Sequence, residues 1–356
     1  MPAASADYRH WMLYALGGGM GHLTRATSLA RAAVRSLIPD SERTSGVQIS
    51  LLTNSPFASQ LPLATELGTG SQIVTLDPHP GRDETARSVT SILQKSSMDV
   101  LVVDTFPRGL GGELSDILPK LNCHKVLIHR DLNPRYCAQV DIAGFVRQFD
   151  CILVPGESAP FDTFPQAIQT VPWLIRDAHE LMSPAAALRM LEVETQNLPV
   201  VAVIGCGKSS EVQEMRSIAA QLTKDFRLQA CVRFVTPQRS ESAAVSIRSQ
   251  SEVHTVQLWP FLQAIRGVAM IVGSGGYNTV NEARATQTAF LGLSQPRLYD
   301  RQDRRLRAHE RVSGYQELRQ RVAVVLESCS MQPIGSAPRY ENGVHKAIEI
   351  IESLCG

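Results

Sequence analysis

The sequence has no Cys-x-x-Cys pair, and no apolar run approaches the roughly 20 residues that a membrane-spanning helix requires. Its seven cysteines are scattered, which is typical of reduced buried thiols rather than of a disulfide framework. A net charge of +1 gives no reason to expect binding to nucleic acid. Residues 1–7 contain no basic stretch before an apolar core, so we expect no signal peptide. These absences predict a cytoplasmic protein.

The apolar content is ample and is arranged in short runs. With 356 residues and 44% hydrophobic residues, the chain is long enough for two domains. The runs are continuous rather than alternating and are separated by segments long enough for helices, which is typical of parallel strands buried on both faces. The predicted strands are 11–16, 47–53, 72–76, 100–104, 125–129, 151–154, 199–204, 228–235, 253–258, 268–272, 288–293 and 322–326.

A gap in this series of strands predicts the domain organisation. We expect a first domain over 1–175, a connector over 176–198, a second domain over 199–340 and a closing amphipathic helix over 341–356. Each domain is predicted to be a Rossmann-like, doubly wound parallel α/β sheet. Because ligands bind beyond the carboxyl ends of such strands, two facing sheets would form a cleft between the domains.

Three glycine-rich segments follow predicted strands: Gly-Gly-Gly-Met-Gly-His at 17–22, Gly-Cys-Gly-Lys-Ser at 205–209 and Gly-Ser-Gly-Gly at 273–276. A glycine loop that enters a helix is a ready anion site, because the helix N-terminus offers free N–H groups and partial positive charge. After the third loop, Glu282 falls a turn or two inside the helix, where it suits the hydroxyl pair of a ribose. Together the loops favour a nucleotide ligand.

Two other nucleotide sites are less favoured by the residues. His22 stands where the last glycine of the GxGxxG dinucleotide motif would be, and the second strand ends without an acidic residue. The segment 202–209 matches a relaxed phosphate loop of nucleotide triphosphatases, with Ala202 for the first glycine. That match would place Val203 and Ile204 in the loop, whereas these apolar residues fit better in the strand.

On the residues of these three loops, the chain resembles GT-B glycosyltransferases, and most of all the MurG-like group that uses UDP-activated sugars. The first loop resembles the group's N-terminal glycine loop, which ends in histidine. The second resembles the loop that opens the donor domain. The third, with Thr279, Glu282 and the Asp-Arg-Gln sequence at 300–302, resembles the donor signature. The blocks span nearly the whole chain.

The resemblance implies transfer of a sugar from a nucleotide diphosphate donor, with a UDP-sugar as the expected donor, to an acceptor hydroxyl. Inversion at the sugar is expected from one-step displacement. His22 is the candidate base, because imidazole titrates near neutral pH, and Asp104 is the second candidate. The residues expected to contact the donor are Gly19, Gly21, Gly207, Ser209, Gly275, Gly276, Thr279, Glu282 and Gln302.

Two features depart from what such enzymes often have. In the MurG-like group, Asp-Arg-Gln is followed by a Gln and an Asn whose amides contact the donor sugar. Here an arginine-rich stretch at 303–307 replaces them, so the donor sugar is expected to differ from N-acetylglucosamine. No Asp-x-Asp sequence is present, so we expect no metal or other cofactor. Leaving-group charge would instead be stabilised by helix N-termini and a cationic side chain such as Lys208.

The sequence leaves several questions open. A nucleotide-sugar hydrolase or epimerase of the same fold is one alternative, and a non-catalytic nucleotide-sugar-binding protein is another. The acceptor is unidentified. Peripheral contact with the inner face of the membrane is possible by analogy with relatives that act on lipid-linked acceptors.

Overall fold

The computed structural model describes residues 7–37, 45–78, 81–139, 141–194, 198–238, 253–329 and 338–356. The chain divides into two compact units. The N-terminal unit comprises Met1–Ile175, Leu298–Asp300 and Asn342–Gly356, and the C-terminal unit comprises Arg176–Arg297 and Arg301–Glu341. The expectation about a signal peptide concerns residues 1–7, of which only Asp7 lies within the described part.

The N-terminal unit is built on a seven-stranded parallel sheet in the order β3-β2-β1-β4-β5-β6-β7. The order runs outward in both directions from the β1–β4 pair, which is the arrangement of a doubly wound fold. The strands are β1 (Asp7–Ala15), β2 (Ser45–Thr53), β3 (Gln72–Thr75), β4 (Val100–Asp104), β5 (His124–Ile128), β6 (Cys151–Pro155) and β7 (Ala167–Thr170).

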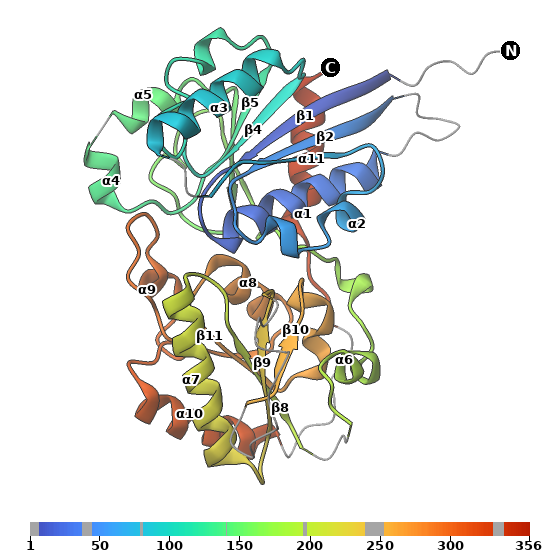
Figure 1. Cartoon of the computed structure of the whole chain (residues 1–356), viewed down its shortest axis with the longest axis vertical. Helices are drawn as coiled ribbons and strands as arrows, with labels where there is room; N and C mark the ends of the chain where they lie inside the picture. Colours follow the sequence, from blue (N-terminus) through green and yellow to red (C-terminus); the bar gives the residue numbers. More distant parts are fainter. Residues whose placement is uncertain are drawn as a thin grey trace, which may run out of the picture. The chain divides into compact units, whose positions relative to one another are not determined.

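Both faces of this sheet are buried, as continuous apolar strands require. On one face, alternate residues of β1 such as Met12 and Tyr14 join Val89 and Leu93 of α3 (Arg82–Lys95) in one core cluster. On the other face, α1 (Met20–Ser36) packs on β1 and β2, and the last helix, α11 (Gly343–Leu354), packs against α1 (Figure 1). The C-terminal end of the chain therefore completes the N-terminal unit.

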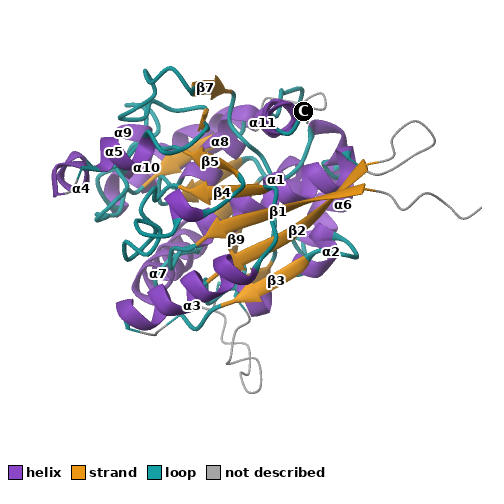
Figure 2. Ribbon diagram, turned by 90° about the horizontal axis from the view of Figure 1, so that it is seen from above, coloured by secondary structure: helices purple, strands orange, loops and turns teal. Residues whose placement is uncertain are grey.

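The C-terminal unit contains a five-stranded parallel sheet in the order β10-β9-β8-β11-β12. Its core joins the sheet to helices α7 and α10. Figure 2 shows the strands of both units in orange and the helices in purple. The elements are β8 (Val200–Ile204), α7 (Ser209–Phe226), β9 (Cys231–Thr236), β10 (Thr255–Gln257), β11 (Met270–Gly273), α8 (Tyr277–Ala285), β12 (Ala289–Gly292) and α10 (Tyr315–Cys329).

Short helices occupy several connections. In the N-terminal unit they are α2 (Leu63–Leu67), α4 (Pro134–Gln139) and α5 (Ile142–Val146), and in the C-terminal unit they are α6 (Pro184–Met190) and α9 (Gln302–Arg305). Within the described ranges, no helix is both long and apolar enough to cross a membrane.

The predicted fold class is confirmed, because both units are parallel α/β sheets and the chain ends in a helix that packs against α1. One strand prediction is wrong: residues 322–326 lie inside α10. A five-residue apolar run fits a buried strand and the core face of a helix equally well, so periodicity could not decide. The strand β7 was not predicted, because its exposed Gln169 interrupts the apolar pattern.

Candidate active site

The sequence motifs of the N-terminal unit meet where β1 and β4 lie side by side. The strand order reverses at this pair, so the connections from the two carboxyl ends diverge to opposite faces of the sheet. The loop after β1 carries Gly17 and leads into α1, and the loop after β4 begins at Thr105. Open α/β sheets bind their ligands at such a point.

The first glycine loop is shaped around His22. Gly17 has a φ of +149°, and its N–H donates to Oδ1 of Asn54 at 2.9 Å. A Cβ atom on Gly17 would lie only 2.5 Å from Cδ2 of His22, so a side chain there would displace the imidazole. Gly19 is the N-cap of α1, and His22 is the third helical residue. The glycines therefore let the imidazole lie against the loop backbone.

His22 is held by Asp104, the last residue of β4. Nδ1 of His22 lies 2.6 Å from Oδ2 of Asp104, and 18% of the histidine side chain remains exposed. Because a carboxylate only accepts hydrogen bonds, Nδ1 carries the proton and donates. In the neutral ring, Nε2 is then free to accept a proton from a ligand. The pair has the geometry of a general base and the carboxylate that orients it.

Arg25, one turn further along α1, completes this arrangement. Its Nε and Nη2 donate to the two oxygens of Asp104 at 2.8 and 2.7 Å, and the guanidinium is buried. Burial raises the pKa of Asp104, but the Arg25 charge and the hydrogen bonds from His22 and Arg25 outweigh it and lower the pKa to about 2. Asp104 is therefore ionised at neutral pH and stays an acceptor for His22.

The turn after Asp104 brings an aromatic ring onto His22. Thr105 has a φ of +73°, which is unusual for a β-branched residue. Nη2 of Arg25 donates to Oγ1 of Thr105 at 3.1 Å, and the Thr105 N–H donates to the Ile128 carbonyl at 2.9 Å. The following residue, Phe106, stacks on the His22 ring with a centroid distance of 5.3 Å.

In the C-terminal unit, the loop after β8 is organised by Glu211 of α7. Oε2 of Glu211 accepts from the Lys208 N–H at 3.0 Å and from Nη2 of Arg297 at 2.6 Å. Gly207 has a φ of +126°, and a Cβ atom there would lie 2.2 Å from the same Glu211 oxygen. Ser209 begins α7 and is exposed. An arginine and a helix N-terminus thus flank one glycine loop, which suits an anion.

The loop after β11 is the second glycine loop of this unit. β11 pairs with β8, so the two loops leave neighbouring strands at the point where the strand order reverses. Gly276 is the N-cap of α8, and the carbonyl of Gly275 accepts from Nη1 of Arg305 at 2.9 Å. Thr279 is the third residue of α8, and a Cβ on Gly273 would lie 3.5 Å from its methyl group.

Glu282 lies one turn beyond Thr279, so the two residues share a face of α8. It is 7% exposed, and no described residue forms a hydrogen bond with its carboxylate. Burial raises the pKa of Glu282 to about 7. Burial, followed by the charge of Glu282, raises the pKa of the Cys206 thiol to about 11. A buried carboxylate without a partner is costly, which makes it a candidate ligand contact.

We expect Glu282→Gln to stabilise the C-terminal unit at alkaline pH. In the unfolded chain Glu282 loses its proton near its ordinary pKa, whereas in the folded protein it keeps the proton until about pH 7. Stability therefore falls between these pH values, by up to roughly 3 kcal/mol. Melting curves from pH 5 to 8 should show this loss in the wild type and not in Glu282→Gln. Glu341→Gln, at an exposed position, is the control, and equal pH slopes in all three proteins would contradict the assignment.

The other predicted site residues fall in one unit or the other. Gly19 and Gly21 lie at the start of α1, beside His22. Gln302 begins α9 and is buried, and its Oε1 accepts from the Gln295 N–H at 2.9 Å. This hydrogen bond uses the side-chain oxygen of Gln302, so the amide nitrogen is the group that could donate to a ligand. Among the described residues, no three His, Cys, Asp or Glu side chains gather in a way that could hold a metal ion.

Sequence reasoning missed Arg25, Glu211 and Arg297. Arg25 follows His22 by three residues, a spacing that places both on one helix face, and this was the available signal. Glu211 stands three residues after the Lys208 N-cap, which is the spacing of a capping box. Nothing in the sequence connects Arg297 with Glu211, because 86 residues separate them.

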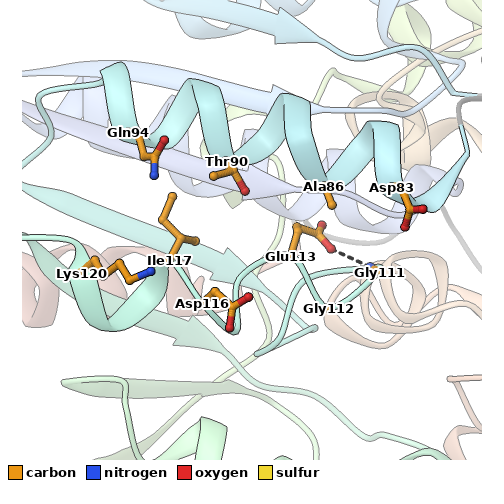
Figure 3. A pocket seen from close by; sticks show the side chains of 10 residues that line it. All are labelled: Asp83, Ala86, Thr90, Gln94, Gly111, Gly112, Glu113, Asp116, Ile117 and Lys120. Carbon is orange, nitrogen blue, oxygen red and sulfur yellow. Dashed lines mark hydrogen bonds between the residues drawn. The ribbon is translucent and has the colours of Figure 1, made fainter.

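A pocket of about 380 Å³ lies elsewhere in the N-terminal unit, between α3 and the segment 111–120 (Figure 3). None of the predicted site residues lines it. Glu113 on its wall is already engaged, because its carboxylate accepts from the Gly111 N–H at 2.7 Å and from the Tyr14 hydroxyl. Three other lining residues, Asp83, Asp116 and Lys120, are exposed. The carboxylate of Glu113 therefore holds the turn at 111–113 in place.

No protein-family model and no curated protein sequence matches the chain. Solved structures do match over almost its whole length. The glycotransferase of kitacinnamycin gives a TM-score of 0.60 at 13% identity, covering 98% of this chain and 99% of that one. A putative UDP-N-acetylglucosamine 2-epimerase from Listeria monocytogenes gives 0.62 at 12% identity, covering 98% and 96%. The spinosyn rhamnosyltransferase complexed with thymidine diphosphate gives 0.54 at 14% identity, covering 97% and 95%.

These similarities define the fold. The chain has the GT-B fold, which both glycosyltransferases and UDP-N-acetylglucosamine 2-epimerases share. The identities of 12–14% distinguish neither of these activities and do not single out the MurG-like group.

Proposed function

We propose that the protein is a metal-independent glycosyltransferase that moves a sugar from a nucleoside diphosphate donor, a UDP-sugar in the first instance, to an acceptor hydroxyl. The observation that carries this proposal is the His22–Asp104 pair at the β1–β4 junction, where an ionised carboxylate orients a partly exposed imidazole. Neighbours in fold with a bound UDP-sugar or thymidine diphosphate support a nucleotide donor.

In the proposed reaction, Nε2 of His22 takes the proton of the acceptor hydroxyl as its oxygen attacks the anomeric carbon of the sugar. The bond from that carbon to the diphosphate oxygen breaks, and the electron pair leaves with the nucleoside diphosphate. One displacement inverts the configuration at the sugar. Asp104 acts through His22 and is unsuited to be the base itself, because its pKa of about 2 makes it a weak proton acceptor.

The C-terminal unit supplies the groups proposed to bind the donor. The first-turn N–H groups of α7 and α8 and the guanidinium of Arg297 would meet the diphosphate and stabilise its charge as it leaves. Gly207, Gly275 and Gly276 would allow the phosphates to approach the backbone. The carboxylate of Glu282, which no described residue contacts, would accept hydrogen bonds from the ribose diol.

Nucleotide binding is the direct test of this donor site. UDP at about 100 times its Kd should stabilise the C-terminal unit by about 2.7 kcal/mol and raise its melting temperature. UDP that lacks both ribose hydroxyls should give a much smaller shift, because Glu282 would lose its partners. Glu282→Gln should reduce the shift with UDP and leave the shift with the dideoxy compound unchanged.

The result also separates the alternatives. If no nucleoside diphosphate shifts the melting temperature, the glycosyltransferase proposal is wrong. If nucleotides bind and the sugar nucleotide is isomerised or hydrolysed without an acceptor, the protein is an epimerase or hydrolase of this fold. Mass spectrometry and NMR of a sugar nucleotide incubated with the protein alone distinguish these outcomes. Binding without any conversion, whatever the acceptor, would indicate a non-catalytic protein.

A further inference from the structure

Three aromatic side chains form a cluster in the N-terminal unit that contacts His22 through Phe106. Beyond the His22–Phe106 stack, Tyr299 meets Phe106 at a centroid distance of 5.2 Å and an interplanar angle of 75°. Tyr136 meets Tyr299 at 5.1 Å and 79°, and Phe106 at 6.2 Å and 80°. Aromatic residues make up only 6% of the sequence, so three of them in one cluster that contacts the candidate base are a marked local concentration. We call Phe106, Tyr136 and Tyr299 the ring cluster.

The ring cluster is assembled from three separate segments. Phe106 follows β4, Tyr136 lies on α4, and Tyr299 belongs to the short segment Leu298–Asp300 that groups with the N-terminal unit. The carbonyl of Tyr299 accepts from the Asn133 N–H at 3.0 Å, which fixes the segment next to α4. Phe106 is buried, whereas Tyr136 and Tyr299 remain partly exposed. The cluster thus has a closed base and an open side.

The hydroxyls of Tyr136 and Tyr299 form no hydrogen bond with any of the described residues. By contrast, the hydroxyls of Tyr14, Tyr315 and Tyr340 donate to Glu113, to Asp225 and to the Arg176 carbonyl. Burial raises the pKa of Tyr136, so its hydroxyl keeps its proton and can donate at neutral pH. Half-buried tyrosines whose hydroxyls form no hydrogen bond within the described part of the chain, packed on the ring that stacks on the candidate base, offer a ligand both apolar ring surface and hydrogen bonds.

We propose that the ring cluster is the acceptor subsite and that the acceptor is a small hydroxylated aromatic compound. This inference rests on the proposed function. Rings that meet at 75–80° present a face and an edge at once, which is the geometry that a further aromatic ring packs against. The Tyr136 and Tyr299 hydroxyls would hold polar substituents on that ring, and its reacting hydroxyl would reach His22.

The acidity of a phenol suits this base. A phenolic hydroxyl has a pKa of about 10, so an imidazole removes its proton more readily than that of an aliphatic alcohol. The proton passes from the phenol to Nε2 of His22, and the phenol oxygen bonds to the anomeric carbon. The bond between that carbon and the diphosphate breaks with its electron pair. The products are an aryl glycoside and the nucleoside diphosphate.

Direct binding of 7-hydroxycoumarin, followed by its fluorescence without any nucleotide, tests the subsite. The wild type should bind the probe, and Tyr299→Ala and Tyr136→Ala should each raise the Kd about tenfold, because each removes a ring contact. Tyr299→Phe keeps the ring and should lose less than Tyr299→Ala. Tyr8→Ala, at a position 54% exposed on β1, is the control and should bind as the wild type does.

A second arm measures transfer. With the sugar nucleotide that gives the largest melting shift, 7-hydroxycoumarin should yield a glycoside by mass spectrometry, whereas 7-methoxycoumarin, which lacks the hydroxyl, should yield none. The proposal is overturned if the probe does not bind, if the alanine variants bind it like the wild type, or if methyl glucoside is glycosylated and the coumarin is not. A melting transition of the N-terminal unit like that of the wild type shows that the tyrosine variants are folded. If no nucleoside diphosphate shifts the melting temperature of the wild type, the proposed function itself is refuted, separately from the subsite.

Discussion

Replacing His22 by alanine should lower turnover about 10²- to 10⁴-fold, because the acceptor hydroxyl would lose its general base. The affinity for UDP should stay within a few-fold of the wild type, because the proposed donor contacts lie in the C-terminal unit. Turnover is measured with saturating sugar nucleotide and acceptor, and UDP affinity by thermal shift. His309→Ala, at an exposed histidine of the C-terminal unit, is the matched control and should keep full activity.

Asp104→Asn tests whether the orientation of His22 matters for turnover, because the histidine itself is kept. Asparagine keeps the size of the side chain but removes the charge that Arg25 and His22 share, so turnover should fall while His22 remains. NMR of the imidazole nitrogens should find the proton on Nδ1 in the wild type. If His22→Ala and Asp104→Asn both left turnover unchanged, the assignment of this pair as base and orienting carboxylate would be wrong.

Removing Arg25 should have the largest effect on stability. Arg25→Met would leave the fully buried Asp104 without its cation, and breaking a buried ion pair in this way costs about 3–5 kcal/mol. The melting transition of the N-terminal unit should fall accordingly at pH 7. The double variant Arg25→Met with Asp104→Leu removes both charges and should recover much of the loss, because apolar pairs of similar volume replace buried ion pairs well. It should nevertheless stay inactive.

The pH dependence gives a further check on Arg25. The folded-state pKa of Asp104 is lowered to about 2, below its ordinary value of 3.8, so the stabilisation is present above that value and is lost as the pH falls toward 2. The wild type should lose this contribution between about pH 4 and pH 2. In Arg25→Met, burial still raises the pKa of Asp104 and His22 opposes it without Arg25, so the Asp104 proton should bind at a higher pH than in the wild type. If Arg25→Met had the same melting temperature as the wild type at pH 7, this result would contradict the buried ion pair.

Much of the fold could be predicted from local sequence. Continuous Val/Ile/Leu runs of four to eight residues, with helix-length segments between them, predict parallel strands covered on both faces, and the sheets have this architecture. The glycine loops also follow from the residues, because only glycine tolerates the φ values at Gly17 and Gly207 together with the side chains that lie against them. Residues 322–326 of α10 were wrongly predicted as a strand, because an apolar run of five residues is too short to distinguish the periodicity of a helix from that of a strand.

The sequence named the candidate site residues one by one, and their roles stay predictions; it did not give their arrangement. His22 and Glu282 could be identified because each has a fixed place after a strand and a glycine loop. The proposal that Asp104 orients His22 and is not itself the base rests on Arg25, which meets Asp104 across 79 residues of chain. The burial that raises the pKa of Glu282 to about 7 likewise comes from packing around α8.

The sequence by itself therefore determined the two parallel sheets, the loops that end their strands and the candidate base, because these depend on local patterns of residue type. Only the tertiary structure decided that Arg25 binds the carboxylate of Asp104, that Arg297 lies beside the Gly207 loop, and that Tyr299 and Tyr136 pack on Phe106, which stacks on His22. These contacts join segments far apart in the chain. Their partners are fixed by the order of the strands and the packing of the helices, which no local pattern encodes.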